Sequence, residues 1–462
     1  MNYNDNIMLT EMDLTNLSKQ LLLEECEKLG ITKCKSKNKT ELIELIEKYK
    51  GSTNTKIVDN VVTIDDESES SFNFIDLFCG IGGFHQALTN MNGKCVFACD
   101  IDEKCRNIYE QNYKLKPDGD ITKINISQIP NFDVLCGGFP CQPFSKAGLQ
   151  KGFDDDRGNL FFNICNIIKH HKPKYMILEN VRNLASHDDG NTWKTIYKNI
   201  TELGYTTYET PIILNVLHFN VPQNRERVVI LCKRNDLGEL PVLPIINKTP
   251  KQHLTNFIAN VIENDTDETS HKLTGKMKDV HNVWNSFITI LTENNIEMPK
   301  FPIWTDWWDN VLDLNNPFYA KYTSWIDKNQ CFYKTNITIL ETWLVTSRQN
   351  ANWFGAVRKF EWQAGNLNET NNSLDKCLWS ARGSGIRVKK CDYIPTLVAM
   401  SMIPIYGPKN RKLTPRELLR LQSFPDTFMY DSKTIHKQVG NAVNVKMIEQ
   451  CARFLLFDEP LL

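Results

Sequence analysis

The residue in this chain best suited to covalent chemistry is Cys141, which follows the glycine turn Gly137-Gly138 and Pro140. The apolar run Asp133 to Cys136 before that turn predicts a buried strand. A thiol held on a stiff Pro-Cys turn at a strand end is well placed to act as a nucleophile. Because a free cysteine is more often a small buried hydrophobe, the case for Cys141 depends on the residues that accompany it.

Two charged segments complete a plausible catalytic set. Glu179 follows the apolar run Tyr175 to Leu178, which places a carboxyl at the end of a second predicted strand. Arg225 and Arg227 are spaced i, i+2, so in an extended segment their side chains point to the same side. The alternative for Glu179 is a structural ion pair, and the alternative for the arginines is ordinary surface solvation.

A glycine-rich turn, Cys79 to Gly83, lies between a predicted strand and a helix that begins at Phe84. Such a turn lets a ligand approach the backbone beside a helix N-terminus. The next predicted strand ends in Asp100, about 20 residues on, where an acid accepts ribose hydroxyls in nucleotide-binding folds. Asp120 is a third acid, which can equally cap a helix from a turn. Together they predict a nucleoside-bearing cofactor, and the absence of GxGxxG spacing makes a dinucleotide less favoured.

The elements that must position these residues form an alternating pattern of short apolar runs and helical stretches over residues 72–233. This pattern predicts a doubly wound, Rossmann-like α/β sheet. The expected strands are Phe72 to Phe78, Lys94 to Cys99, Asp133 to Gly137, Tyr175 to Leu178, Thr207 to Leu214 and Arg227 to Cys232, with helices from Asn159 to His170 and from Thr192 to Leu203.

Residues 234–390 lose this pattern and hold most of the tryptophans, so we interpret them as an inserted, mostly irregular domain. The tryptophans are more typical of a core than of base stacking. A compact pattern returns over residues 391–462, which we assign to the same domain as residues 72–233. Lys412 to Glu417 predicts a helix with Thr414 as cap and proline at its first position.

Residues 10–50 predict a small helical hairpin, with Gly30 ending the first helix, a lysine-rich link and a second helix capped by Thr40. The hairpin resembles the SAP module, which binds the DNA backbone, although a generic hairpin for protein contacts is the alternative. Residues 51–71 are polar and predict a linker.

Composition limits the classes of function. The 462 residues are 41% hydrophobic and 24% charged, with a formal net charge of -1, so nucleic-acid binding must rely on local basic patches. The 14 cysteines are scattered without zinc spacing, so we expect no metal. No apolar stretch reaches the roughly 20 residues that span a bilayer. The start of the sequence lacks signal-peptide features, so we expect an intracellular, reducing compartment. We also expect no membrane partner and a monomeric protein.

Six motifs in order resemble the DNA (cytosine-5)-methyltransferases over residues 72 to about 457, with the insertion in the expected place. They are Asp76-Leu77-Phe78-Cys79-Gly80-Ile81-Gly82-Gly83, Pro140-Cys141-Gln142, Glu179-Asn180-Val181, Gln223-x-Arg225-x-Arg227, Leu413-Thr414-Pro415-Arg416-Glu417 and Gly440-Asn441-Ala442-Val443. Each tripeptide alone is weak evidence, whereas the ordered set is specific.

The resemblance implies covalent catalysis on cytosine. Cytosine C5 is a poor nucleophile, and addition of the Cys141 thiolate to C6 makes C5 carbanion-like. Glu179 would supply a proton at ring N3, which requires a raised pKa in a closed pocket. Arg227 would hold the base O2 and orient Glu179, with Arg225 helping.

The implied methyl donor is S-adenosylmethionine. Asp100 would accept its ribose hydroxyls, Asp120 would meet the adenine amino group, and Asn441 would close over it. Ile101 stands where the family often has an aromatic residue that stacks on adenine. The residues expected to contact this cofactor are Phe78, Gly80, Gly82, Gly83, Asp100, Ile101, Asp120, Pro140 and Asn441.

The implied macromolecular partner is double-stranded DNA, from which the target cytosine must be flipped out. Gln142 and Ser145 lie on a loop, expected over about residues 144–153, that would close on DNA with its base fixed by Arg157. Sequence specificity would reside in the insertion, where Arg382 and Arg387 are the expected DNA contacts.

Two other readings remain open. Related enzymes methylate tRNA, but they typically carry Pro-Pro-Cys and Cys-Phe-Thr signatures where this chain has Phe139-Pro140-Cys141 and Cys331-Phe332-Tyr333. A catalytically inactive DNA-binding protein is the second alternative. The sequence gives neither the recognised DNA site nor the setting. A restriction-modification enzyme in cytoplasm or nucleoid, an epigenetic enzyme in a nucleus and an enzyme at a viral replication site all fit.

Overall fold

The computed structural model describes residues 18–19, 22, 37–43, 71–140, 160–245, 254–263, 271–313, 315–365, 372–399 and 402–461. Two compact units make up the chain, Met1–Ser68 and Glu69–Leu462. In the first unit residues 39–43 are helical. Asn38 caps this helix: its Oδ1 accepts from the Glu41 backbone N–H at 3.0 Å, and its own N–H donates to Glu41 Oε2 at 2.8 Å. The cap is therefore Asn38 and not Thr40. Most of the expected SAP-like hairpin and linker lies outside the described residues.

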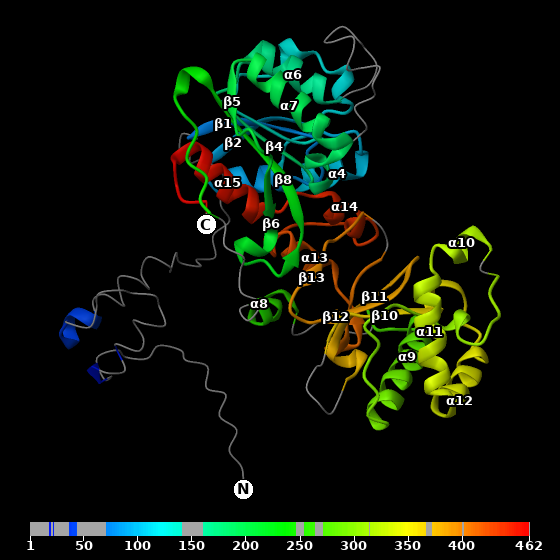
Figure 1. Cartoon of the computed structure of the whole chain (residues 1–462). Helices are drawn as coiled ribbons and strands as arrows, with labels where there is room; N and C mark the ends of the chain where they lie inside the picture. Colours follow the sequence, from blue (N-terminus) through cyan, green and yellow to red (C-terminus); the bar gives the residue numbers. More distant parts are fainter. Residues whose placement is uncertain are drawn as a thin grey trace. The chain divides into compact units, whose positions relative to one another are not determined.

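A seven-stranded sheet forms the centre of the larger unit, in the order β2-β1-β3-β4-β8-β5 with β6 also paired to β8 (Figure 1). The first four strands are parallel, and β8 runs antiparallel to β4, β5 and β6. The strands are β1 (Phe72–Leu77), β2 (Gly93–Cys99), β3 (Val134–Gly138), β4 (Tyr175–Val181), β5 (Tyr205–Thr207), β6 (Ile212–Asn215) and β8 (Glu226–Arg234).

This is the α/β fold expected from the sequence, with one difference in the strands. The single strand expected over residues 207–214 is two strands, because Pro211 has no N–H to donate to a ladder and interrupts the run.

Alternating side chains bury both faces of this sheet. On one face Phe74 and Leu231 belong to the core formed with α3 and α15. On the other face Ile75 and Ile230 pack with α6 and α7. The helices packed on the two faces of the sheet are α3 (Gly83–Thr89), α4 (Glu103–Tyr113), α6 (Leu160–His171), α7 (Asn191–Glu202) and α15 (Val445–Phe457). The double burial explains why these strands read as nearly continuous apolar runs.

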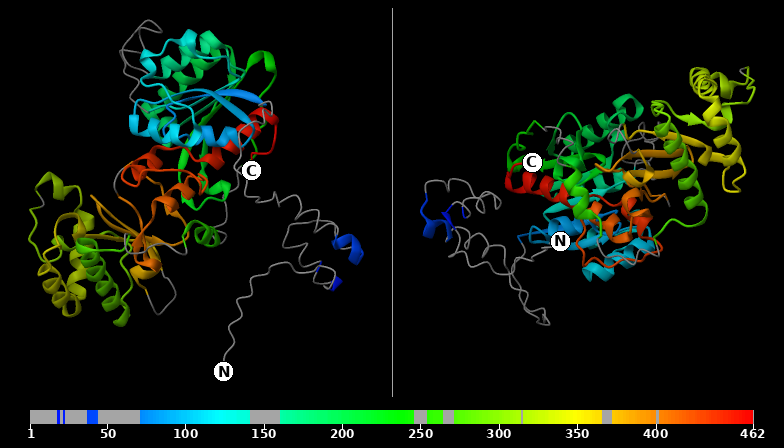
Figure 2. Two further views of the ribbon diagram at one scale, coloured as in Figure 1. Left: turned by 180° about the vertical axis from the view of Figure 1, so that it is seen from behind. Right: turned by 90° about the horizontal axis from the view of Figure 1, so that it is seen from below.

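The insertion is largely regular structure, so the expectation of a mostly irregular domain was wrong. It contains a six-stranded sheet in the order β15-β14-β11-β12-β10-β9, with helices α9, α11 and α12 packed on one side (Figure 2). Its elements are α8 (Leu254–Val261), α9 (Gly275–Glu293), β9 (Ile303–Trp304), α10 (Pro317–Ala320), α11 (Thr323–Thr335), α12 (Ile337–Arg348), β10 (Lys359–Trp362), β11 (Cys377–Arg382), β12 (Gly385–Lys390), β14 (Ile405–Tyr406) and β15 (Arg411–Lys412). Several strands are only two residues long, too short to show an alternating pattern.

The expectation that the tryptophans form a core is confirmed for most of them. Trp284 is fully buried, and its ring stacks on Phe360 with 4.3 Å between centroids. Trp308, Trp343, Trp353 and Trp379 are buried in the same cluster. These rings join the helices to the inner face of the six-stranded sheet.

After β12 the chain returns to the segment that precedes β8. β13 (Ile394–Pro395) pairs in parallel with β7 (Gln223–Asn224). Two helices follow, α13 (Pro415–Leu421) and α14 (Ile435–Asn441). The expected cap of α13 is confirmed, because the Glu417 N–H donates to Thr414 Oγ1 and the Thr414 N–H donates to a Glu417 carboxylate oxygen.

Candidate active site

The candidate active site lies where β1, β3 and β4 end together. Because these strands are neighbours and parallel, their carboxyl ends meet at one edge of the sheet. The glycine turn follows β1, and Pro140 follows β3. Glu179 lies within β4, two residues before its end. The fold thus brings the three segments singled out in the sequence to one edge.

Glu179 and Arg227 form a close ion pair at this edge. Arg227 lies opposite Val181 in the β4–β8 ladder, so its side chain shares a face with Glu179. The Arg227 Nε lies 2.8 Å from the Glu179 Oε1, and the side chains are only 11% and 9% exposed. Burial raises the pKa of the Glu179 carboxyl above its ordinary value, and the charges of Arg227 and Arg225 oppose that rise. The carboxyl therefore retains a proton more readily than an exposed glutamate.

The turn that leads to Cys141 is held against this pair. Gly138 is opposite Glu179 in the β3–β4 ladder, and a Cβ at Gly138 would lie 3.8 Å from Glu179 Oε2. The buried Asn180 amide donates to the Phe139 carbonyl at 2.9 Å. Asn180 was not assigned a role from the sequence, although a polar residue in a buried strand was a signal. Cys141, Gln142, Ser145 and Arg157 lie outside the described residues.

Arg225 does not share the position of Arg227, despite its i, i+2 spacing. It lies between β7 and β8 and is 1% exposed. Its guanidinium donates to the Leu397 carbonyl at 3.0 Å and to the Gly440 and Ala442 carbonyls at 3.1 and 2.8 Å. These contacts do not fit the expectation that Arg225 helps to hold a base. They join the returning end of the insertion to the segment before α15.

The glycine turn after β1 has the backbone shape that its composition predicts. Phe78, Gly80 and Gly82 have positive φ angles of 54°, 54° and 91°. The Gly80 N–H donates to Asp100 Oδ2 at 2.8 Å. Burial raises the pKa of Asp100, and the hydrogen bonds from Asp102 and Gly80 oppose the rise. The turn and the acid therefore form one hydrogen-bonded unit at the end of β1 and β2.

The segment before α15 packs on this turn. A Cβ at Gly83 would lie 2.6 Å from Val443 Cγ2, and a Cβ at Gly138 would lie 3.7 Å from Val443 Cγ1. Only glycine at position 83 allows this approach. Asn441, two residues earlier, is exposed at the end of α14.

The remaining expected cofactor residues have less defined surroundings. Ile101 is 77% exposed. Pro140 is also exposed. Asp120 Oδ1 accepts from the Thr122 N–H and hydroxyl at 3.0 and 2.8 Å, which is the helix-capping arrangement considered as its alternative role. The other carboxylate oxygen of Asp120, Oδ2, lies 4.0 Å from Lys123 Nζ.

A buried polar cluster behind the turn was missed in the sequence. Asp76 is fully buried in β1, 3.5 Å from the Tyr109 hydroxyl, which lies 2.7 Å from His85 Nδ1. The Tyr113 hydroxyl donates to the Gly82 carbonyl at 2.9 Å. Burial raises the pKa of Asp76 well above its ordinary value. The sequence feature that could have revealed this cluster is Asp76, an acidic residue in the apolar strand β1.

Arg382 and Arg387 lie on β11 and β12 of the six-stranded sheet, not at the strand-end edge. Among the described residues, no group of three or more histidine, cysteine or acidic side chains is arranged to hold a metal ion. Within the same part of the chain, no helix combines the length and apolar character needed to cross a membrane.

Comparison with known proteins gives one consistent match. Residues 72–456 match the family of C-5 cytosine-specific DNA methylases. Type II methyltransferase M.BanI of Aneurinibacillus aneurinilyticus is 32% identical over 419 residues, which cover 82% of this chain and 94% of that protein. Type II methyltransferase M.HhaI of Haemophilus parahaemolyticus is 46% identical over 178 residues, so the match spans 38% of this chain and about half, 54%, of that relative. The crystal structure of S. pombe Dnmt2 methyltransferase covers 84% of this chain and 99% of its own, at 18% identity and a TM-score of 0.45.

Proposed function

Since this chain belongs to the family of C-5 cytosine-specific DNA methylases, we propose that it methylates C5 of a flipped-out cytosine in a specific duplex DNA sequence. The methyl donor in this proposal is S-adenosylmethionine, and the covalent nucleophile is Cys141. The observation that carries the proposal is the buried Glu179–Arg227 pair beside the turn that leads to Cys141.

The roles of the residues follow from this arrangement. The Cys141 thiolate adds to C6, and the electron pair of the C5–C6 bond becomes available at C5. Glu179 holds a proton at the position of ring N3, because its burial favours the neutral acid. Arg227 fixes Glu179 and offers its remaining N–H groups to O2 of the base. After methyl transfer, loss of the C5 proton and departure of the Cys141 thiolate restore the aromatic ring.

Arg225 is a positioning residue in this mechanism. It is buried, and its three bonds to carbonyls hold Leu397 beside the segment Gly440 to Ala442. That segment continues into Val443, which contacts both Gly83 and Gly138. Arg225 therefore acts on the reaction through the backbone around the site.

The residues around the glycine turn fit S-adenosylmethionine. The left-handed backbone at Phe78, Gly80 and Gly82 turns away from β1, and the space beside Gly80 is open. Asp100 lies at the end of β2 and keeps an unused lone pair on each oxygen for ribose hydroxyls. When bound, the cofactor supplies the methyl group as a sulfonium electrophile. Ile101, Asp120, Pro140 and Asn441 are the proposed outer contacts.

We further propose the domain assignment made from the sequence. Residues 72–233 and most of 391–462 form the catalytic domain, and residues 234–390 recognise the target together with β14 and β15, which complete the six-stranded sheet from within 391–462. Residues 10–50 add a SAP-like DNA-binding hairpin through a linker at 51–71. The loop with Gln142 and Ser145 closes on duplex DNA, with Arg157 at its base. The relatives that carry the name Type II methyltransferase support an intracellular restriction-modification role.

The test compares methyl transfer to duplex DNA and to tRNA, with bisulfite sequencing to locate the product. Wild-type protein is expected to methylate cytosine in DNA. Cys141→Ser should abolish turnover while S-adenosylmethionine still binds. Cys331→Ser is the matched control, because Cys331 is an exposed thiol on α11. Turnover on tRNA alone, or wild-type turnover by Cys141→Ser, would contradict the proposal.

A further inference from the structure

The outer face of the β11–β12 hairpin carries an excess of positive charge. The ladder pairs Ser380 with Arg387 and Leu378 with Lys389, so these side chains share one face with Arg382. Trp379 points to the opposite face, into the core of the insertion. The hairpin is therefore apolar on its inner side and cationic on its outer side.

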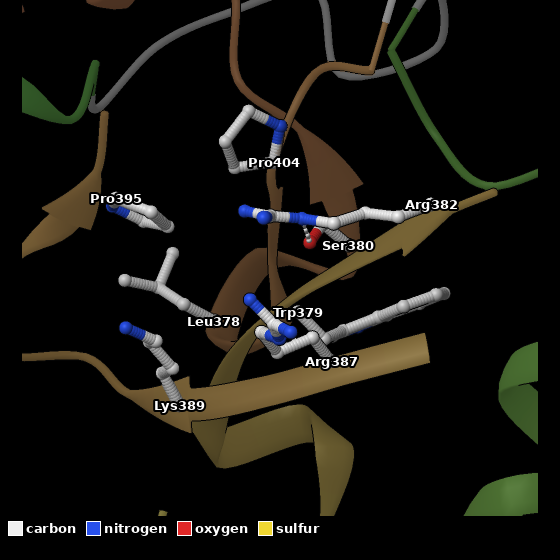
Figure 3. A pocket seen from close by; sticks show the side chains of 8 residues that line it. All are labelled: Leu378, Trp379, Ser380, Arg382, Arg387, Lys389, Pro395 and Pro404. Atoms are coloured by element: carbon white, nitrogen blue, oxygen red, sulfur yellow. Dashed lines mark hydrogen bonds between the residues drawn. The ribbon is translucent and has the colours of Figure 1, made fainter. Parts of the chain in front are cut away.

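Arg382, Arg387 and Lys389 line a recess with about 10 Å³ of internal space, whose other walls include Leu378, Pro395 and Pro404 (Figure 3). Small-molecule sites are usually larger, about 300–1,000 Å³. The recess therefore suits the edge of a larger molecule. Figure 3 shows both guanidinium groups on the same side of the two strands, with the Lys389 amine beside them.

Each arginine is fixed by one neighbour through its Nε. Arg387 Nε donates to Glu361 Oε2 at 3.0 Å, and Arg382 Nε donates to Ser380 Oγ at 3.2 Å. Within the described part of the chain, neither arginine uses its terminal nitrogens in a hydrogen bond. These pre-oriented donors point into the recess and are available to a partner.

Acidic groups of the protein balance only part of the positive charge in the recess. Burial, and next the charge of Arg387, lower the pKa of Arg382 below its ordinary value. The pKa of Lys389 is also lowered, by burial and then by Arg387 and Arg382, with Asp392 and Glu361 opposing. Acceptor atoms brought into the recess would relieve this repulsion.

The surroundings of Arg387 favour a neutral acceptor over a phosphate. The Glu361 carboxylate lies 3.0 Å from its Nε and would repel a nearby anion. The walls formed by Leu378, Pro395 and Pro404 would also leave a phosphate poorly hydrated. The major-groove edge of guanine offers two neutral acceptors, O6 and N7, that match two parallel N–H donors.

We infer that Arg387, held by Glu361, reads the O6 and N7 of a guanine in the recognised DNA sequence. This inference rests on the proposed function and specifies one base of the DNA sequence that the protein recognises. Because Arg387 lies on the six-stranded sheet and not at the strand-end edge that holds Glu179, we assign it a guanine other than the one paired with the target cytosine. Arg387→Lys cannot form the two parallel bonds, so the lysine should lose most of the discrimination.

The experiment uses full-length protein and a library of randomised DNA duplexes, read by bisulfite sequencing. In Arg387→Ala the preference for that guanine should fall by ten- to a hundredfold, with a smaller loss in Glu361→Gln. Arg348→Ala is the matched control, because Arg348 lies in the same insertion with both terminal nitrogens on Asp309 at 2.6 and 2.7 Å. Thermal melting checks that each variant is folded.

A second measurement separates base reading from phosphate binding. Replacing the guanine by 7-deazaguanine removes N7 and should weaken wild-type binding, measured by fluorescence anisotropy, but leave Arg387→Ala unchanged. Inosine keeps O6 and N7 and should have no effect at this position. A uniform loss of affinity on all sequences in Arg387→Ala would overturn the inference in favour of a phosphate contact. Failure of the wild-type protein to methylate any duplex would instead overturn the proposed function, and this inference with it.

Discussion

The two largest sheets of the larger unit differ in how their charged groups are paired. At the edge of the seven-stranded sheet the Glu179 and Arg227 side chains are 9% and 11% exposed, and each meets the charge of the other. On the outer face of the six-stranded sheet Arg387 is 35% exposed and lies among cations that outnumber their acidic neighbours. Groups that act on reacting atoms are thus fixed by burial, whereas groups that meet a partner keep free donors. Changes in the first sheet should alter rate, and changes in the second should alter choice of DNA.

The largest expected effect is that of Glu179→Gln on rate. A glutamine cannot give a proton to ring N3, so turnover should fall about 10²- to 10⁴-fold. The sequence preference should stay as in the wild type, which radiolabel transfer and bisulfite sequencing would show together. Glu226→Gln is the control, because Glu226 is a partly exposed acid on the same strand pair, bonded to Arg182 at 3.0 Å. A variant within tenfold of wild type would remove Glu179 from the mechanism.

Arg225→Met should cause the next largest change, in stability. Three buried carbonyls lose their donor, and each unsatisfied group costs about 1–3 kcal/mol. Urea unfolding of the purified protein should show a lower midpoint, with partial recovery in Arg225→Lys. Arg182→Met removes only an exposed ion pair and should cost about 1 kcal/mol or less. Equal stability of the two methionine variants would contradict the role given to Arg225.

Lys389→Ala tests the six-stranded sheet with a smaller effect. An ammonium group is a point charge that does not select a base. Its loss should weaken DNA binding similarly on all sequences and reduce the slope of log affinity against log salt by about 0.9. Lys198→Ala on α7 is the control, because Lys198 is a solvent-exposed lysine that pairs with Glu202. A change of preference at a single base position would instead give Lys389 a reading role.

The smallest expected effect concerns Asp76 and pH. Because burial raises its pKa in the folded state, the folded protein binds the proton more tightly than the unfolded chain. Stability contributed by this group should therefore fall as pH rises from its ordinary pKa through the raised value. Thermal melting of Asp76→Asn should show a weaker decline over that range. Asp236→Asn, at an exposed site, should follow the wild-type curve closely. A wild-type slope in Asp76→Asn would contradict the assignment.

The seven-stranded sheet was largely predictable because its strands are buried on both faces and read as continuous apolar runs. The position of Glu179 beside the turn at Gly138 also followed from two strands ending at one edge. The position of the Arg225 side chain could not be predicted in this way, because i, i+2 spacing implies a shared side only within one continuous strand. Here Arg225 lies between β7 and β8, and its partners are 172 to 217 residues away in the chain.

The insertion was hard to predict for a different reason. Its sheet is built from short strands brought together from positions as distant as Ile303 and Lys412. Short strands leave no periodic signal, and their pairing is fixed by tryptophans packed beneath them. The cationic recess depends on which face of β11 and β12 each side chain takes, which only the ladder register decides.

The packing of α15 on α3 has a consequence for synthesis of the protein. Asn90, which follows α3, donates to Glu449 in α15 at 2.9 Å across 359 residues of chain. At 5–20 residues per second a ribosome needs roughly 20 to 70 s to cover that distance. During this time the face of the first strands that α15 will cover remains open, with Phe74 and Ile177 among its side chains. The nascent chain therefore passes through a long period in which chaperones have an apolar surface to bind, and truncated translation products should aggregate.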